Sequence, residues 1–119
     1  MSFDALADVL RPYASLLVVA RDEPGHYSLD TRHTMPNGKP LWFGAARAAK
    51  RYVGFHLMPI YVEPALLEGL DPALARRRHG KSCFNFRPRD EIPIAALARL
   101  VARGYALYAE RGYVPSRTG

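Results

Sequence analysis

The dipeptide Asn37-Gly38 stands between two segments that are typical of β-strands, and this arrangement constrains the fold more than any other local feature. Asparagine and glycine both tolerate the positive φ angles of a tight, two-residue primed turn. The segment 27–31 before the turn alternates polar and apolar residues, and the segment after it begins with the apolar run 41–43. The sequence therefore predicts an antiparallel hairpin at this point.

Further segments are expected to extend this hairpin into an antiparallel sheet. The β-branched pair 18–19, followed by the Pro-Gly break at 24–25, predicts a strand before the hairpin. After the third strand and a charged reversal at 50–51, the aromatic and aliphatic run 52–62 predicts a long fourth strand. The segment 82–86 alternates polar and aromatic residues and predicts a fifth. Four strands then form a meander to which the fifth returns.

Helical spacing and capping residues predict the remaining elements. Residues 3–10 predict an opening helix, and acidic-proline pairs predict one or two short helices over 64–79, ended by Gly80. Asp90 is expected to cap a final helix that Gly112 ends. The expected fold is α+β, a two-layer sandwich in which helices cover one face of a five-stranded antiparallel sheet, in the order α-β-β-β-β-α-β-α.

Composition limits the class of protein. A chain of 119 residues with 49% hydrophobic residues predicts a single domain over 1–119 with a substantial core. One cysteine, Cys83, excludes an internal disulfide framework and fits a reducing compartment. No apolar run approaches the roughly 18 residues of a spanning helix, so we expect a cytoplasmic protein without a membrane partner. Lys and Arg exceed Asp and Glu by 17 − 11 = 6, which favours anionic partners.

The two-residue period of a strand decides which side chains the uncovered sheet face presents. Phe55, Phe84 and Phe86 are expected in the core. The residues expected on the opposite face are Arg47, Tyr52, His56, Met58, Lys81, Cys83 and Asn85. Their aromatic, soft, hydrogen-bonding and cationic groups suit a small anionic ligand or a protein partner. The alternative is an ordinary solvated sheet face that binds nothing.

Other chemistries find less support in the sequence. Cys83 and His56 could form a nucleophile and base if their strands are neighbours, but no cysteine-nucleophile signature surrounds them, so we expect a non-enzymatic protein. The four histidines lack metal-ligand spacing, and no metal or cofactor is predicted. The basic run 76–81 could contact nucleic-acid phosphates, although a solvated helix end is the simpler interpretation. Exposed strand edges fit a monomer or a homodimer.

Three strings in the sequence, at 39–44 (KPLWFG), 52–61 (YVGFHLMPIY) and 80–86 (GKSCFNF), resemble the YdhG-like family of small bacterial domains of unknown function. The resemblance covers roughly residues 20 to 112 and implies an α+β fold similar to that of frataxin. For some relatives it implies an intracellular iron-chaperone role, which is the alternative function. Frataxin-type iron binding uses clustered carboxylates on the first helix, where this chain has Asp4 and Asp8.

Overall fold

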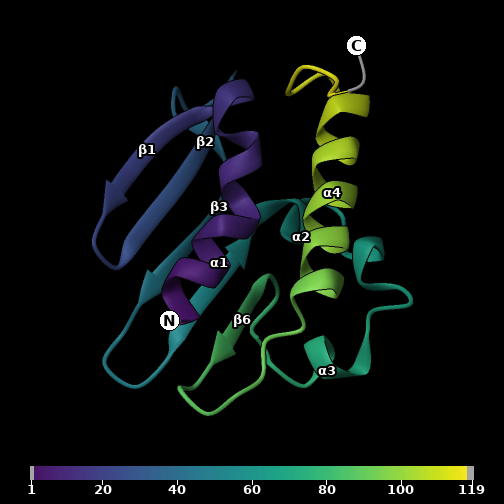
Figure 1. Ribbon diagram of the computed structural model, residues 1–119. Coiled ribbons are helices and arrows are strands. Elements are labelled where there is room, and N and C mark those ends of the chain that lie inside the picture. Colours follow the sequence, from purple (N-terminus) through teal and green to yellow (C-terminus); the bar gives the residue numbers. More distant parts are fainter. Residues whose placement is uncertain (1, 118–119) are drawn as a thin grey trace.

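A six-stranded antiparallel sheet forms one layer of the protein (Figure 1). The computed structural model describes residues 2–117. The strands follow the order β1-β2-β3-β4-β6-β5 across the sheet. They are β1 (Val18–Glu23), β2 (His26–Thr34), β3 (Pro40–Ala48), β4 (Val53–Leu57), β5 (Arg78–His79) and β6 (Cys83–Phe86). The predicted α+β class with an antiparallel sheet is confirmed, and the two-residue edge strand β5 is an addition to the five strands predicted.

Two helices, α1 (Ser2–Leu10) and α4 (Ile94–Glu110), lie side by side over one face of this sheet (Figure 1). Helix α1 packs mainly against β3 and also contacts α4. The shorter helical segments are η1 (Arg11–Leu16), α2 (Met58–Val62), η2 (Pro64–Leu67) and α3 (Pro72–Ala75). No helix within residues 2–117 has the length and apolar character needed to cross a membrane.

The core lies between the sheet and the two long helices. Phe55, Phe84 and Phe86 are fully buried there, as predicted. The helices contribute Leu10 and Leu97, which are also inaccessible to solvent. Burying several side chains of this size, at about 1.5–3 kcal/mol each, is the main term that holds the helices on the sheet.

The β2–β3 hairpin is confirmed, but its turn differs from the predicted one. Gly38 has a positive φ of 83°, whereas no non-glycine residue among 2–117 has a positive φ. The amide of Gly38 donates to the carbonyl of Met35 at 2.9 Å, and the amide of Met35 donates to the carbonyl of Lys39 at 2.8 Å. The loop is therefore a three-residue turn in which Pro36 presets the first position and glycine supplies the left-handed one.

The predicted fourth strand is too long, because the chain leaves the sheet after Leu57 and forms α2 from Met58. Pro59 is the reason. Proline has no amide hydrogen for a strand ladder, but it fits the first turn of a helix, where that hydrogen has no partner. The amide of Glu63 donates to the carbonyl of Pro59 at 2.8 Å and closes this short helix.

Two helix-end predictions are wrong. Gly80 does have a positive φ of 75°, but it lies in the turn between β5 and β6 and ends no helix. The basic run 76–81 begins at Arg76, the C-cap of α3, and continues through β5 into the β5–β6 turn. Asp90 does not cap α4, because its carboxylate accepts the Arg87 amide at 2.7 Å and pairs with Arg77 at 3.2 Å. Helix α4 begins at Ile94, directly after Pro93.

The predicted end of the last helix at Gly112 is confirmed. Gly112 has a φ of 79°, and its amide donates to the carbonyl of Ala109 at 3.1 Å. The amide of Tyr113 donates to the carbonyl of Tyr108 at 2.9 Å. These two bonds form a Schellman motif, which satisfies carbonyl groups that the helix end would leave unpaired.

Candidate functional site

The sheet face opposite α1 and α4 carries a hollow of about 600 Å³, which we call the sheet hollow. Strands β2, β3, β4, β5 and β6 and the β3–β4 turn all contribute to it. Its lining residues are His26, Trp42, Ala45, Arg47, Ala48, Ala49, Tyr52, Gly54, Phe55, His56, His79, Cys83 and Asn85. This lining includes one guanidinium group, three imidazoles and no carboxylate.

Strand register brings these side chains together. His56 lies opposite Ala45 on one side and Cys83 on the other. Gly54 lies between Arg47 and Asn85 in the same way. Directly paired residues of an antiparallel sheet present their side chains on the same face. The two cross-strand rows therefore place the imidazole, thiol, guanidinium and amide groups on one surface.

A bulge in β3 adds the indole of Trp42 to this surface. Leu29 on β2 pairs with Gly44, and the next residue, Asp30, pairs with Trp42, so Phe43 has no partner on β2. Phe43 is fully buried in the core. Because the bulge inserts one residue into the alternation, Trp42 faces the hollow together with Ala45, three positions away. A strict two-residue period would place Trp42 on the core face.

Close packing under this bulge requires glycine at position 44. A Cβ atom there would lie 2.8 Å from the carbonyl oxygen of His56 and 3.4 Å from Cδ2 of Leu10. The first distance is well below van der Waals contact. Gly44 therefore allows β3 and β4 to approach each other beneath the hollow.

Trp42 and His56 form a stacked pair in the hollow. Their ring centroids are 4.1 Å apart and their planes differ by 13°. The indole Nε1 donates to Oγ of Ser28 on β2 at 3.0 Å. A ring that is stacked on one side and hydrogen-bonded at its edge has a single orientation, so the pair gives the hollow a fixed flat wall.

Cys83 and His56 are in direct contact, as their predicted strand positions allowed. The Nδ1 atom of His56 lies 3.0 Å from Sγ of Cys83 and 3.3 Å from Oγ of Ser82. Burial lowers the pKa of His56 to about 4. Burial also raises the pKa of the Cys83 thiol, and a hydrogen bond from Ser82 offsets part of this effect. At neutral pH the pair is therefore a neutral imidazole and a protonated thiol, without the thiolate that nucleophilic catalysis requires.

The structure brings five of the seven predicted site residues into the hollow. These are Arg47, Tyr52, His56, Cys83 and Asn85. Met58 and Lys81 do not line the hollow. Met58 begins α2 and packs against the core, because the strand alternation ends at the residue before it. Lys81 lies in the β5–β6 turn, with Nζ 5.3 Å from the ring centre of Tyr61 on α2.

Among the residues of the hollow that were not predicted from the sequence, three carry an imidazole or indole ring: His26, Trp42 and His79. The pairing of β2 with β3 places His26 opposite Arg47, so the hairpin register could have identified it. His79 lies on β5, a strand of two residues that gives no periodic signal. Trp42 could not be found by alternation because the bulge reverses its expected face.

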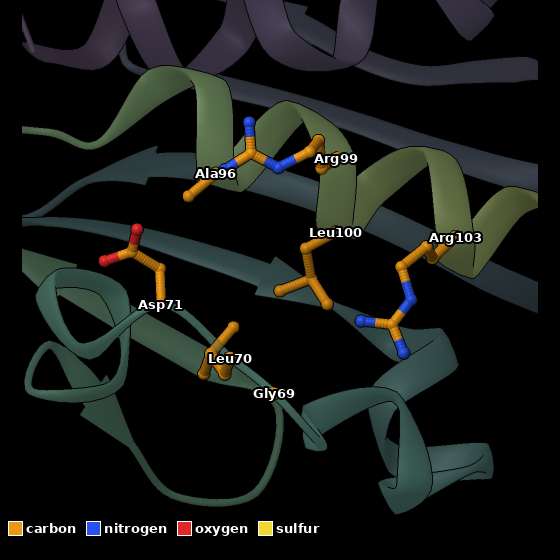
Figure 2. Close-up of a pocket in the computed structure, with 7 residues that line it drawn as sticks. All are labelled: Gly69, Leu70, Asp71, Ala96, Arg99, Leu100 and Arg103. Carbon is orange, nitrogen blue, oxygen red and sulfur yellow. The ribbon is translucent and has the colours of Figure 1, made fainter.

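A smaller hollow of about 220 Å³ lies between the segment 69–71 and α4 (Figure 2). Arg99 and Arg103 of α4 line it together with Asp71. The Asp71 carboxylate accepts the amide of Ala73 at 2.8 Å and caps α3. This acidic group makes the smaller hollow a poorer site for an anion than the sheet hollow.

No group of three or more His, Cys, Asp or Glu side chains within the described part of the chain is arranged to hold a metal ion. Asp4 and Asp8, on which an iron site would depend, are both exposed on α1. Asp8 is paired with Arg11 at 3.0 Å.

The fold and the sheet hollow define an α+β protein with one open sheet face. Comparison of the chain with protein-family models, with curated proteins and with solved structures finds no match. The resemblance to the YdhG-like family, with its frataxin-like fold, stays a prediction.

Proposed function

We propose that this protein is a non-enzymatic binding domain that holds a small anionic ligand in the sheet hollow. The observation that carries the proposal is the lining itself, which combines Arg47 with three imidazoles and no carboxylate. The volume of the sheet hollow, about 600 Å³, lies within the ~300–1,000 Å³ typical of small-molecule sites.

Arg47 is the group best suited to anchor an anion. Its guanidinium group takes no part in the four ion pairs found within residues 2–117. Arginine presents two parallel donors to a carboxylate or phosphate. Trp42, stacked on His56, supplies a flat wall, and the exposed ring of Tyr52 also lines the hollow. The carboxamide of Asn85 can both donate and accept hydrogen bonds.

The neutral state of the Cys83–His56 pair favours binding over catalysis. A thiol enzyme needs a thiolate, or a base that can take the thiol proton near neutral pH. Burial moves the pKa of His56 down to about 4 and the pKa of Cys83 up, so both shifts oppose proton transfer from sulfur to nitrogen.

A matched pair of fragments tests the proposal. Benzoate and benzamide have the same ring and differ in charge. We expect benzoate, and not benzamide, to shift the backbone amide resonances of β3, β4 and β6 at millimolar concentration. The Arg47→Gln variant should weaken benzoate binding about tenfold, the loss expected for one charge-assisted contact.

Two further variants complete this experiment. Gly54→Leu should block the hollow, because the new side chain would extend between Asn85 and Tyr52. The fold should tolerate it, since a Cβ atom at this position lies at ordinary contact distances, 3.5 Å from Oδ1 of Asn85 and 3.7 Å from Cε2 of Tyr52. Arg99→Gln removes an equal charge at the smaller hollow and should leave binding unchanged. Equal binding of benzoate and benzamide, or resonance shifts outside the sheet hollow, would refute the proposal.

A further inference from the structure

A second depression adjoins the sheet hollow at the β3–β4 turn, and we call it the basic recess. Its lining residues are Ala49, Lys50, Arg51, Tyr52, Arg87 and Pro88. Ala49 and Tyr52 also line the sheet hollow, so the two spaces meet at these residues. A ligand that occupies the sheet hollow beside Tyr52 can therefore extend into the recess.

The charged residues that line the recess are all cationic. Lys50 and Arg51 come from the turn, and Arg87 follows β6. None of the three takes part in an ion pair found within residues 2–117. The carboxylate of Asp90 accepts the backbone amide of Arg87, but it forms its ion pair with the Arg77 side chain. Three cationic side chains thus remain for an external anion.

The backbone of the turn and the sheet register bring these three residues to one end of the sheet. The amide of Ala49 donates to the carbonyl of Tyr52 at 2.8 Å and closes the reversal that carries Lys50 and Arg51. Arg87 directly follows Phe86, which pairs with Val53 at the start of β4. Pairing of β4 with β6 therefore brings Arg87 to the same end of the sheet as the turn.

We propose that the ligand of the sheet hollow is a nucleoside phosphate, with its planar base in the hollow and its phosphate in the basic recess. This inference rests on the proposed function and names its ligand class. The hollow offers aromatic walls and the Asn85 amide, which suit a flat, hydrogen-bonding heterocycle. The recess offers three cations with no acidic side chain in its lining, which suit the dianionic charge of a phosphate more than the single charge of a carboxylate.

Trp42 is the single tryptophan of the chain and lies in the hollow, so its emission reports binding directly. The probes are adenosine monophosphate, adenosine and inorganic phosphate. We expect the monophosphate to bind at least about tenfold tighter than adenosine, because the phosphate adds charge-assisted hydrogen bonds. Inorganic phosphate should weaken the binding of the monophosphate and not that of adenosine.

Variants locate the phosphate. The double variant Lys50→Gln/Arg51→Gln should abolish the advantage of the monophosphate while leaving adenosine and benzoate binding unchanged. The control Arg76→Gln/Arg78→Gln removes two exposed charges from the basic run at 76–81 and should change neither affinity. Thermal unfolding of both variants checks that they keep the fold.

The failure of this inference is distinguishable from failure of the proposed function. Equal affinity for the monophosphate and adenosine, with benzoate still bound at Arg47, would overturn the phosphate assignment alone. Absence of benzoate binding would refute the proposed function as well. A hexaadenylate strand that binds more than about tenfold tighter than the monophosphate, with a steeper salt dependence, would show a nucleic-acid strand as the ligand and overturn the mononucleotide assignment.

Discussion

His56 determines the chemistry of the sheet hollow because it contacts the indole on one side and the thiol on the other. Its ring is partly buried, and burial disfavours its charged form. A neutral imidazole can accept the hydrogen bond of the Cys83 thiol, whereas an imidazolium cannot. The stacked pair, the hydrogen bond and the shifted pKa are thus consequences of one position in β4.

The lowered pKa of His56 predicts that the stability of the protein depends on pH. The pKa of His56 is about 4 in the folded protein and near 6.5 in the unfolded chain, so between these values the unfolded chain binds more protons. The contribution of His56 to the free energy of unfolding is therefore fully present above pH ~6.5 and is lost as the pH drops toward ~4. We expect a loss on the order of 2 kcal/mol in the free energy of unfolding, after allowance for solvent screening of the partly buried ring.

Urea unfolding of the wild type and of His56→Gln, across this pH range, measures the effect. The variant cannot titrate at this position and should lack this part of the pH dependence. Burial raises the pKa of Asp30 on β2, and that group acts with the opposite sign. The difference between the two proteins therefore isolates His56, and parallel curves would show that its pKa is not depressed.

At this scale the sequence predicted that Cys83 and His56 share the open face, because both lie on strands with clean alternation. Their contact depends on β4 and β6 being neighbours, which the sequence left open. It did not predict Trp42, whose face depends on one inserted residue, or the displacement of Met58 and Lys81 from the site. Alternation predicts faces only inside a strand, and these last two residues lie beyond strand ends.

At the scale of elements, β3 is the strand that shapes the site, since it carries Trp42, Ala45 and Arg47 on one face and Phe43 on the other. Hairpin turns and the last helix were predictable because glycine, proline and apolar spacing act locally. The boundary between β4 and α2 was not predictable, because residues 52–62 are almost all aromatic or aliphatic on both sides of it and only Pro59 marks the change. Strand β5 is too short to show a period.

Two glycines in adjacent strands provide a matched test of this packing. In Gly44→Ala the new Cβ would lie 2.8 Å from the His56 carbonyl oxygen, and we expect a loss of about 1–3 kcal/mol in the free energy of unfolding. In Gly54→Ala the new Cβ would make its nearest contact at an ordinary 3.5 Å, to Oδ1 of Asn85, so the free energy of unfolding should change little. Chemical denaturation measures both, and equal losses would show that close approach at position 44 is unimportant.

At the scale of the molecule, the helical layer supports the open face through the sheet. Tyr108 of α4 is completely buried, and its hydroxyl donates to the backbone carbonyl of Trp42 at 3.0 Å. Burial raises the pKa of Tyr108, so the hydroxyl keeps its proton at physiological pH. One hydrogen bond thus links the final helix to the residue that forms the wall of the hollow.

Tyr108→Phe removes this link while keeping the ring. The Trp42 carbonyl would lose its partner in a buried place, and we expect a loss of about 1–2 kcal/mol in the free energy of unfolding. Tyr113→Phe is the control, because this half-buried ring packs edge-on against Tyr108. Guanidinium unfolding should show a smaller effect for the control, and equal effects would argue against the hydrogen bond.

The overall architecture was largely predictable from the sequence, because apolar periodicity determines which face each element buries. The location of a hollow on the uncovered face was not, because it depends on how five strands and a turn combine their side chains. His26 and Tyr52 lie 26 positions apart in the sequence, and only the sheet register brings both into the lining of the sheet hollow.

The bulge at Phe43 and Gly44 also bears on how this chain could vary among its relatives. Since the bulge is one residue more than a regular β3 would need, a relative that lacks residue 44 would regain regular pairing with β2 and still point its indole outward. Loss of a residue elsewhere within β3 would move the side chains of part of the strand from the core face to the hollow face, and the reverse. We therefore expect gaps in an alignment of relatives to fall at this position and to be excluded from the rest of β3.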